Sequence, residues 1–133
     1  MSRENLEIAR SAAAAYNRGD LNALMEAYDP AVEFVTLLLG THRGKEAIRP
    51  IFEENRENLS GYSLELEELI DAGPDKVIVV AHLGGAGRVS QIAVGDLIAF
   101  VATFKNGLIV RQETFRNKEE ALEAAGLRDG GTL

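Results

Sequence analysis

The sequence contains no cysteine and no tryptophan, and it has only two histidines among its 133 residues. Without cysteine there are no disulfides, no thiol nucleophile and no zinc–thiolate site. His42 and His82 lie far apart, and no tight spacing of acidic residues and histidine is present, so we expect no metal site. A nucleophile elbow, a phosphate-binding loop and a dinucleotide fingerprint are absent too. We therefore expect no cofactor.

Long apolar runs are also lacking. None reaches the length that spans a membrane, and the first ten residues carry charges where a signal peptide needs an apolar core. The formal net charge of −7 disfavours nucleic acid and anionic membranes as partners. Hydrophobic residues make up 46% and charged residues 26%, a balance typical of soluble globular proteins. We expect one cytoplasmic domain over residues 1–133, with a core at about 4–127 and a loose C-terminal tail.

The first half of the chain carries helix signals. Apolar residues at helical spacing predict a helix that starts at Arg3, with Ser2 as its N-cap, and ends at Gly19. Asp20 is the predicted N-cap of the next helix. The predicted order after it is helix 21–28, a turn at Asp29-Pro30, strand 31–39, loop 40–44 and helix 45–59.

The second half of the chain carries strand signals. The predicted strands are 62–70, 77–85, 93–104 and 108–115. The first alternates and then shifts phase near 67–69, which indicates a bulge, and a hairpin turn at 105–107 joins the last two. Asn117 and Glu120 form a capping-box pattern before a last helix. This order predicts an α+β fold, in which a curved antiparallel sheet wraps around N-terminal helices and forms a cone with an internal pocket.

Four segments carry a family resemblance: AYNRGDLNALMEAYDPAVEF, THRGKEAIRPIFEE, ELIDAGPDKVIVVAH and ATFKNGLIVRQETF. They resemble the nuclear-transport-factor-2-like superfamily, and most of all its small SnoaL-like, ketosteroid-isomerase-like proteins. The resemblance covers about residues 4–127 and implies a cystatin-like α+β barrel. The superfamily includes isomerases, polyketide cyclases, epoxide hydrolases, dehydratases and noncatalytic binders, so function has to be argued from the site.

The catalytic residues of two related enzyme families are missing. In the register that the resemblance implies, the ketosteroid isomerase base, tyrosine and second acid fall at Phe34, Ala12 and Phe100. The Asp–Arg–Asp set of limonene epoxide hydrolases falls at Gly84, His82 and Thr114, so both carboxylates are absent. We expect neither reaction.

The same register implies which strand residues face the pocket, because side chains alternate along a strand. The implied inward residues are Ile78, Val80, His82, Gly84, Ile98, Phe100, Ala102, Phe104, Val110, Gln112 and Thr114. The implied ligand-binding residues are Tyr16, Phe34, Thr36, Val80, His82, Gly84, Phe100, Gln112 and Thr114. Arg111 and Glu113 face away from the pocket.

His82 is the candidate for chemistry because an imidazole titrates near neutral pH. It is also consistent with a structural residue bonded to a partner such as Gln112 or Tyr16, or with a neutral hydrogen bond to a ligand. Asp96 is a second candidate catalytic residue if it reaches His82, although turn chemistry also explains it. We expect His42 to be solvated at the rim of the pocket.

Two functions remain open from the sequence. One is the binding of a hydrophobic, cyclic, polyketide-like or terpenoid-like molecule, with a cofactor-independent isomerase, cyclase or lyase step at His82. The other is a noncatalytic ligand-binding or interaction module. A homodimer through the outer sheet face is expected as well, because Leu97, Ala99 and Val101 are apolar and point outward in this register.

Overall fold

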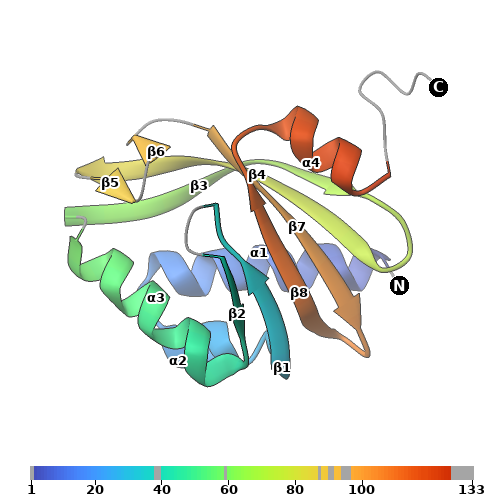
Figure 1. The fold of residues 1–133 in the computed structure, drawn as a ribbon, viewed down its shortest axis with the longest axis horizontal. Helices are drawn as coiled ribbons and strands as arrows, with labels where there is room; N and C mark the ends of the chain where they lie inside the picture. The colour runs from blue at the N-terminus through green and yellow to red at the C-terminus, as the bar shows by residue number, and fades with distance from the viewer. Residues whose placement is uncertain are drawn as a thin grey trace.

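The computed structural model describes residues 2–37, 40–58, 60–86, 88–89, 92–93 and 97–126, and their side chains except those at 2, 55–63 and 83–96 (Figure 1). The helices are α1 (Ser2–Asn17), α2 (Leu21–Met25), α3 (Lys45–Asn58) and α4 (Lys118–Ala124). The strands are β1 (Tyr28–Val35), β2 (Thr41–Arg43), β3 (Ser60–Asp71), β4 (Lys76–Ala86), β5 (Arg88–Val89), β6 (Ile92–Ala93), β7 (Leu97–Lys105) and β8 (Leu108–Phe115).

The main sheet has the strand order β2-β1-β8-β7-β4-β3, and β5 and β6 form a separate two-stranded sheet. β1 and β8 run parallel, whereas the other neighbouring pairs of the main sheet are antiparallel. The sheet curves, with α1, α2 and α3 on its inner face and α4 on its outer face (Figure 1). The predicted α+β class is confirmed. No helix among the described residues is long and apolar enough to cross a membrane.

Local sequence signals act where they were expected. The Asp20 carboxylate accepts a hydrogen bond from the Ala23 N–H at 3.1 Å and caps α2, and the Asn117 side chain accepts one from the Glu120 N–H at 2.8 Å and caps α4. Gly107, in the turn between β7 and β8, has a φ of 80°, which suits glycine. These capping and turn predictions are confirmed.

Several local predictions differ from the structure. The helix predicted over 21–28 ends at Met25, and β1 begins at Tyr28. Ser2, the predicted cap, is the first residue of α1. The predicted turn at Asp29-Pro30 lies inside β1, where Asp29 accepts a hydrogen bond from the Ala31 N–H at 2.8 Å and the pairing with β8 is irregular. The residues that predicted a turn therefore interrupt the regular pairing of β1 with β8. The predicted loop 40–44 contains the short strand β2.

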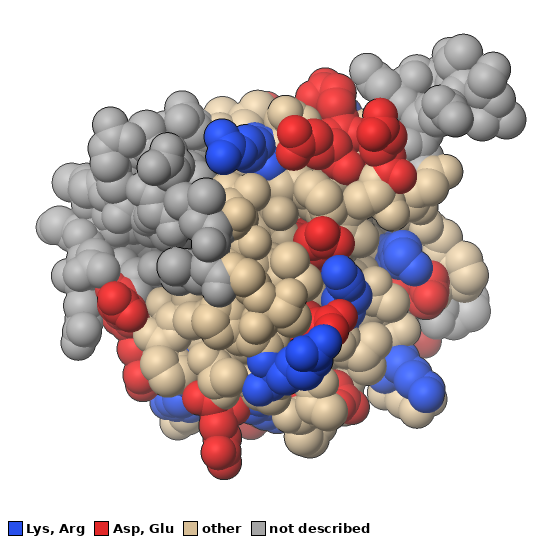
Figure 2. All heavy atoms as spheres, viewed as in Figure 1, with Lys and Arg blue, Asp and Glu red and all other residues tan. Residues whose placement is uncertain are grey.

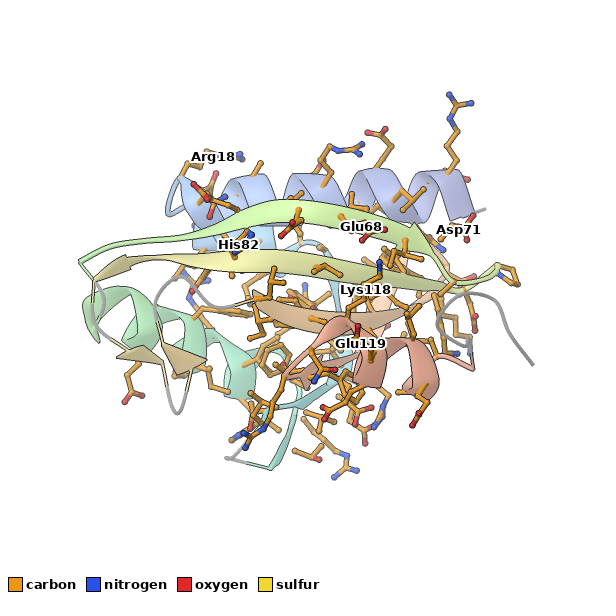
Figure 3. All side chains as sticks on the ribbon, turned by 90° about the horizontal axis from the view of Figure 1, so that it is seen from above. Arg18, Glu68, Asp71, His82, Lys118 and Glu119 are labelled. Carbon is orange, nitrogen blue, oxygen red and sulfur yellow. The ribbon has the colours of Figure 1, made fainter. Side chains whose placement is uncertain are left out.

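The main sheet buries apolar side chains on both faces. On the inner face, Val77, Ala102, Phe104 and Ile109 pack with residues of α1, α2 and α3. On the outer face, a second cluster consists of Ile78, Val80, Ala99, Val101, Ala121 and Leu122. The last two belong to α4, and Figure 3 shows α1 and α4 on opposite sides of β3 and β4.

The outer cluster changes the argument for a homodimer. Ala99 and Val101 were expected to need a second chain to cover them, but α4 of the same chain buries them. Leu97 is 43% exposed and is the exposed large hydrophobic side chain of the described residues. The dimer stays a prediction, and the apolar face no longer requires it.

The part of the outer face away from α4 is charged. Glu33 on β1 lies between two arginines on the neighbouring strands, at 2.7 Å from Arg43 and 3.3 Å from Arg111. Arg111 also contacts Glu113 at 3.3 Å. Figure 2 shows acidic and basic side chains intermingled on the face seen in Figure 1. Arg111 and Glu113 therefore face away from the inner layer, as expected.

Candidate functional site

A cavity of about 150 Å³ lies between the inner face of the sheet and the helices α1, α2 and α3. The polar residues that line it are Tyr16, Tyr28, Thr36, Gln112 and Thr114. Every other described lining residue is alanine, valine, leucine, isoleucine or phenylalanine. Within the described part of the chain, the wall holds no carboxylate, imidazole, amine or guanidinium.

Six of the predicted ligand-binding residues line this cavity: Tyr16, Phe34, Thr36, Phe100, Gln112 and Thr114. Their alternation is as expected, since Phe100 pairs with Thr114 and Ala102 with Gln112, and paired residues of antiparallel strands share a face. Their contact with a ligand stays a prediction.

The prediction for β4 is wrong by one residue. Phe100 pairs with Val79, so Val79 points into the cavity, and Ala81 does so opposite Ile98. The predicted inward set Ile78, Val80 and His82 points to the outer face instead, where Ile78 and Val80 pack in the cluster under α4. A shift of one residue moves every side chain of a strand to the other face.

A bulge corrects the prediction for β8. Thr103 pairs with Arg111 but Phe104 pairs with Ile109, so Val110 is the extra residue. Ile109 lines the cavity in place of the predicted Val110. The predicted register for β8 holds only beyond this bulge.

His82, labelled in Figure 3, belongs to β4 and lies on its outer face. Its Nε2 is 2.6 Å from the carboxylate of Glu67. The bulge predicted near 67–69 is present, between Leu66 and Glu68 of β3, and Glu67 is its extra residue. The side chains of His82 and Glu67 are 42% and 48% exposed. The prediction that His82 is a pocket residue bonded to Gln112 is therefore wrong.

Three of the predicted residues remain to be placed: His42, Gly84 and Asp96. His42 is half-buried on β2, and its Nε2 is buried without a hydrogen-bond partner in the described structure, so it is not the solvated rim residue that was expected. The Gly84 backbone pairs with Ser63 in β4, but its surroundings lie outside the description. Asp96 lies outside the described residues.

The polar feature of the cavity that sequence reasoning missed is a pair formed by Tyr28 and Gln112. The Tyr28 hydroxyl donates a hydrogen bond to Oε1 of Gln112 at 2.8 Å. Burial raises the pKa of Tyr28 well above its ordinary value, and the hydrogen bond to Gln112 opposes this only in part. Tyr28 therefore stays neutral at physiological pH. A polar side chain at an inward position of β8 was the available signal, because a buried amide needs a partner.

Aromatic rings form one side of the wall. Phe52 of α3 contacts Tyr16 and Phe34 edge to face, with ring centroids 5.4 and 5.5 Å apart, and it lies 6.3 Å from the ring of Tyr28. Such contacts add to the free energy of apolar burial and hold the rings in place. The cavity thus has a preformed wall.

Comparison with known families shows which family this chain belongs to. The family described as the SnoaL-like domain matches residues 9–112, which is most of the chain. This chain is a SnoaL-like protein. No curated protein matches it.

Solved structures share the fold of this SnoaL-like protein. An NTF2-like protein from Burkholderia thailandensis is 30% identical over 91% of this chain and 95% of its own, with a TM-score of 0.73. A candidate polyketide cyclase from Sinorhizobium meliloti is 23% identical over 86% and 99%, with a TM-score of 0.71. A protein named TerC, co-crystallised with polyporic acid, is 20% identical over 92% and 98%, with a TM-score of 0.72.

The chemistry available to this SnoaL-like protein follows from its cavity wall. Ala12, Phe34 and Phe100, to which the predicted register assigns the catalytic positions of a ketosteroid isomerase, all line the cavity. General acid–base catalysis needs a group that exchanges a proton near the working pH. Tyrosine, threonine and glutamine do not do so at neutral pH, and they are the polar groups of the described wall. The cavity can bury an apolar molecule and form hydrogen bonds to it.

Proposed function

We propose that this SnoaL-like protein binds a small, neutral, hydrophobic and cyclic molecule in its inner cavity. The observation that carries the proposal is the apolar wall of the cavity, in which the described polar groups are uncharged hydroxyls and one amide. Burying a charged ligand there would cost far more than burying a neutral one, because no opposite charge lies in the described wall.

The size of the cavity limits the ligand. A dry apolar cavity of about 150 Å³ accommodates roughly one aromatic ring. Pockets for drug-sized ligands are larger, at roughly 300–1,000 Å³. We therefore infer a ligand of about one ring, or a larger one that extends out of the cavity. The structural neighbours, one a candidate polyketide cyclase and one crystallised with polyporic acid, support an organic small molecule as the ligand.

The position of His82 favours binding over a proton transfer at that residue. His82 belongs to the outer face, on the opposite side of β4 from the cavity residues Val79 and Ala81. An acid or base acts within hydrogen-bond reach of the reacting atom or through one water. The proposal therefore assigns no catalytic role to His82.

The test compares toluene with benzoate, a probe with the same ring and a negative charge. For ligands of this size a dissociation constant on the order of 0.1–1 mM is expected. In an NMR titration, toluene should shift signals of cavity residues and benzoate should not. If neither toluene nor other one-ring hydrocarbons bind, or if benzoate binds as well as toluene, the proposal is wrong.

A matched pair of variants locates the site on α1. Ala12 lines the cavity, whereas Ala14, two residues further along the same helix, is exposed. Ala12→Leu should fill the cavity and abolish toluene binding, and Ala14→Leu should leave it unchanged. Both substitutions exchange residues of similar helix propensity, so helix stability does not confound the comparison. Equal toluene affinity in the two variants would place the ligand elsewhere.

A further inference from the structure

The pair of Tyr28 and Gln112 gives the cavity a polar end with a defined direction. Tyr28 is 3% exposed, and its hydroxyl donates to Oε1 of Gln112. Gln112 still has an NH₂ group with two N–H donors. Among the described residues this NH₂ group has no hydrogen-bond partner, and its nitrogen is not fully buried. Gln112 lines the cavity. The amide therefore presents donors to a ligand.

Burial explains why the amide is held this way. A hydroxyl that is buried without an acceptor costs free energy, so the Tyr28 O–H keeps Oε1 of Gln112 occupied. Ala102, which pairs with Gln112 across β7 and β8 and also lines the cavity, has only a methyl group. Space is thus left beside the amide for a ligand atom.

We infer that Gln112 selects ligands that carry an uncharged hydrogen-bond acceptor, such as the carbonyl oxygen of a ketone, an ester or a quinone. Tyr28 is the positioning residue that sets this selectivity, because its O–H holds Oε1 of Gln112 toward itself and leaves the NH₂ group to meet a ligand. The inference rests on the proposed function and narrows its ligand class. A neutral acceptor fits because the described wall holds no charged group that could pair with a charged ligand.

The experiment uses three neutral probes with nine non-hydrogen atoms each. Acetophenone carries a carbonyl acceptor, α-methylstyrene has a CH₂ group in place of that oxygen, and indole has an N–H donor. With the wild-type protein, acetophenone should bind about three- to tenfold more tightly than α-methylstyrene, which is the factor that one net hydrogen bond gives. Indole should gain nothing over α-methylstyrene. Equal affinities for acetophenone and α-methylstyrene would overturn the inference while leaving the proposed function standing.

Two variants separate the roles of the pair. Gln112→Leu should remove the preference for acetophenone and retain α-methylstyrene binding. Tyr28→Phe should free Oε1, let the amide turn, and raise indole affinity about threefold or more relative to α-methylstyrene. A purely structural Tyr28 would weaken the three probes alike. A ketone preference that survives in Gln112→Leu, or unchanged indole affinity in Tyr28→Phe, would contradict the assignment of that residue.

A double variant guards against loss of the fold. Gln112→Leu alone leaves the buried Tyr28 hydroxyl unpaired, whereas Tyr28→Phe combined with Gln112→Leu removes both polar groups. Circular dichroism should show the double variant folded, with equal affinity for acetophenone and α-methylstyrene. A ketone preference in the folded double variant would refute the role of the pair. If none of the three probes binds the wild-type protein, the proposed function itself fails.

Discussion

Leu122 is the residue through which the last helix covers the sheet, and its truncation tests that arrangement. Leu122 of α4 is 8% exposed and packs in the cluster that contains Ile78, Val80, Ala99 and Val101. In Leu122→Ala three carbon atoms lose their burial. At about 0.8 kcal/mol for each, the free energy of unfolding should fall by about 2.4 kcal/mol. Incomplete relaxation around the vacated space adds to this loss.

The assay is equilibrium unfolding in urea, followed by circular dichroism. Leucine and alanine have similar helix propensities, so the change reports packing against the sheet rather than stability of the helix. The matched control is Glu123→Ala on the exposed side of α4, which should change the free energy of unfolding by less than about 0.5 kcal/mol. A Leu122→Ala protein as stable as the control would show that α4 does not cover the outer face in solution.

Two further predictions concern side chains outside the cavity. His82→Ala removes a half-exposed contact with Glu67, so the free energy of unfolding should fall by no more than about 1 kcal/mol and toluene affinity should not change. A tenfold loss of toluene affinity would return His82 to the site. The side-chain amide of Asn17 forms two hydrogen bonds with the backbone of Leu64, donating to its carbonyl at 2.9 Å and accepting from its N–H at 2.8 Å. Asn17→Ala should therefore lower the free energy of unfolding, measured in urea, by roughly 1–3 kcal/mol. Asn17→Asp keeps the acceptor and should lose less, and equal losses in the two variants would contradict this account.

The features that could be predicted from the sequence are those set within a few residues. The capping carboxylate of Asp20 and the capping amide of Asn117 each reach an N–H three residues away, so their signals are contained in short segments. Strand 108–115 was predicted with its observed bounds. The bulge in β3 was visible because the alternation of apolar and charged residues changes phase there.

The face of β4 could not be predicted from its own pattern. The inward and outward residues of β4 would be distinguishable only if one set were exposed, but Val77 and Ile78 are both 0% exposed. The helices α1 to α3 cover one face of the strand and α4 covers the other, so apolar residues occur at consecutive positions. The correct parity comes from the pairing with β7, which joins residues about twenty positions apart. Because the register implied by the resemblance is shifted by one residue on β4, it places His82 on the wrong face of the sheet.

The Tyr28–Gln112 pair was out of reach for a related reason. The two residues are 84 positions apart, and they meet only because β1 lies beside β8. Nothing in the segment around Tyr28 distinguishes a tyrosine that ends a helix from one that begins a buried strand. The sequence therefore predicted four polar residues of the wall, Tyr16, Thr36, Gln112 and Thr114, but few of its apolar residues and not the hydrogen bond that orients the Gln112 amide.

The parallel pairing of β1 with β8 has a consequence for how the protein forms. Glu33 pairs with Arg111, and the Ile109 N–H donates to the Ala27 carbonyl at 2.8 Å, so the first strand is held in the sheet by the last one. Contacts between such distant positions close a long loop and form slowly. During synthesis from the N-terminus, β1 and β2 must wait for β8 before they join the rest of the sheet. The cavity is thus completed only once β8 has joined the sheet, and no N-terminal fragment that stops short of β8 contains it.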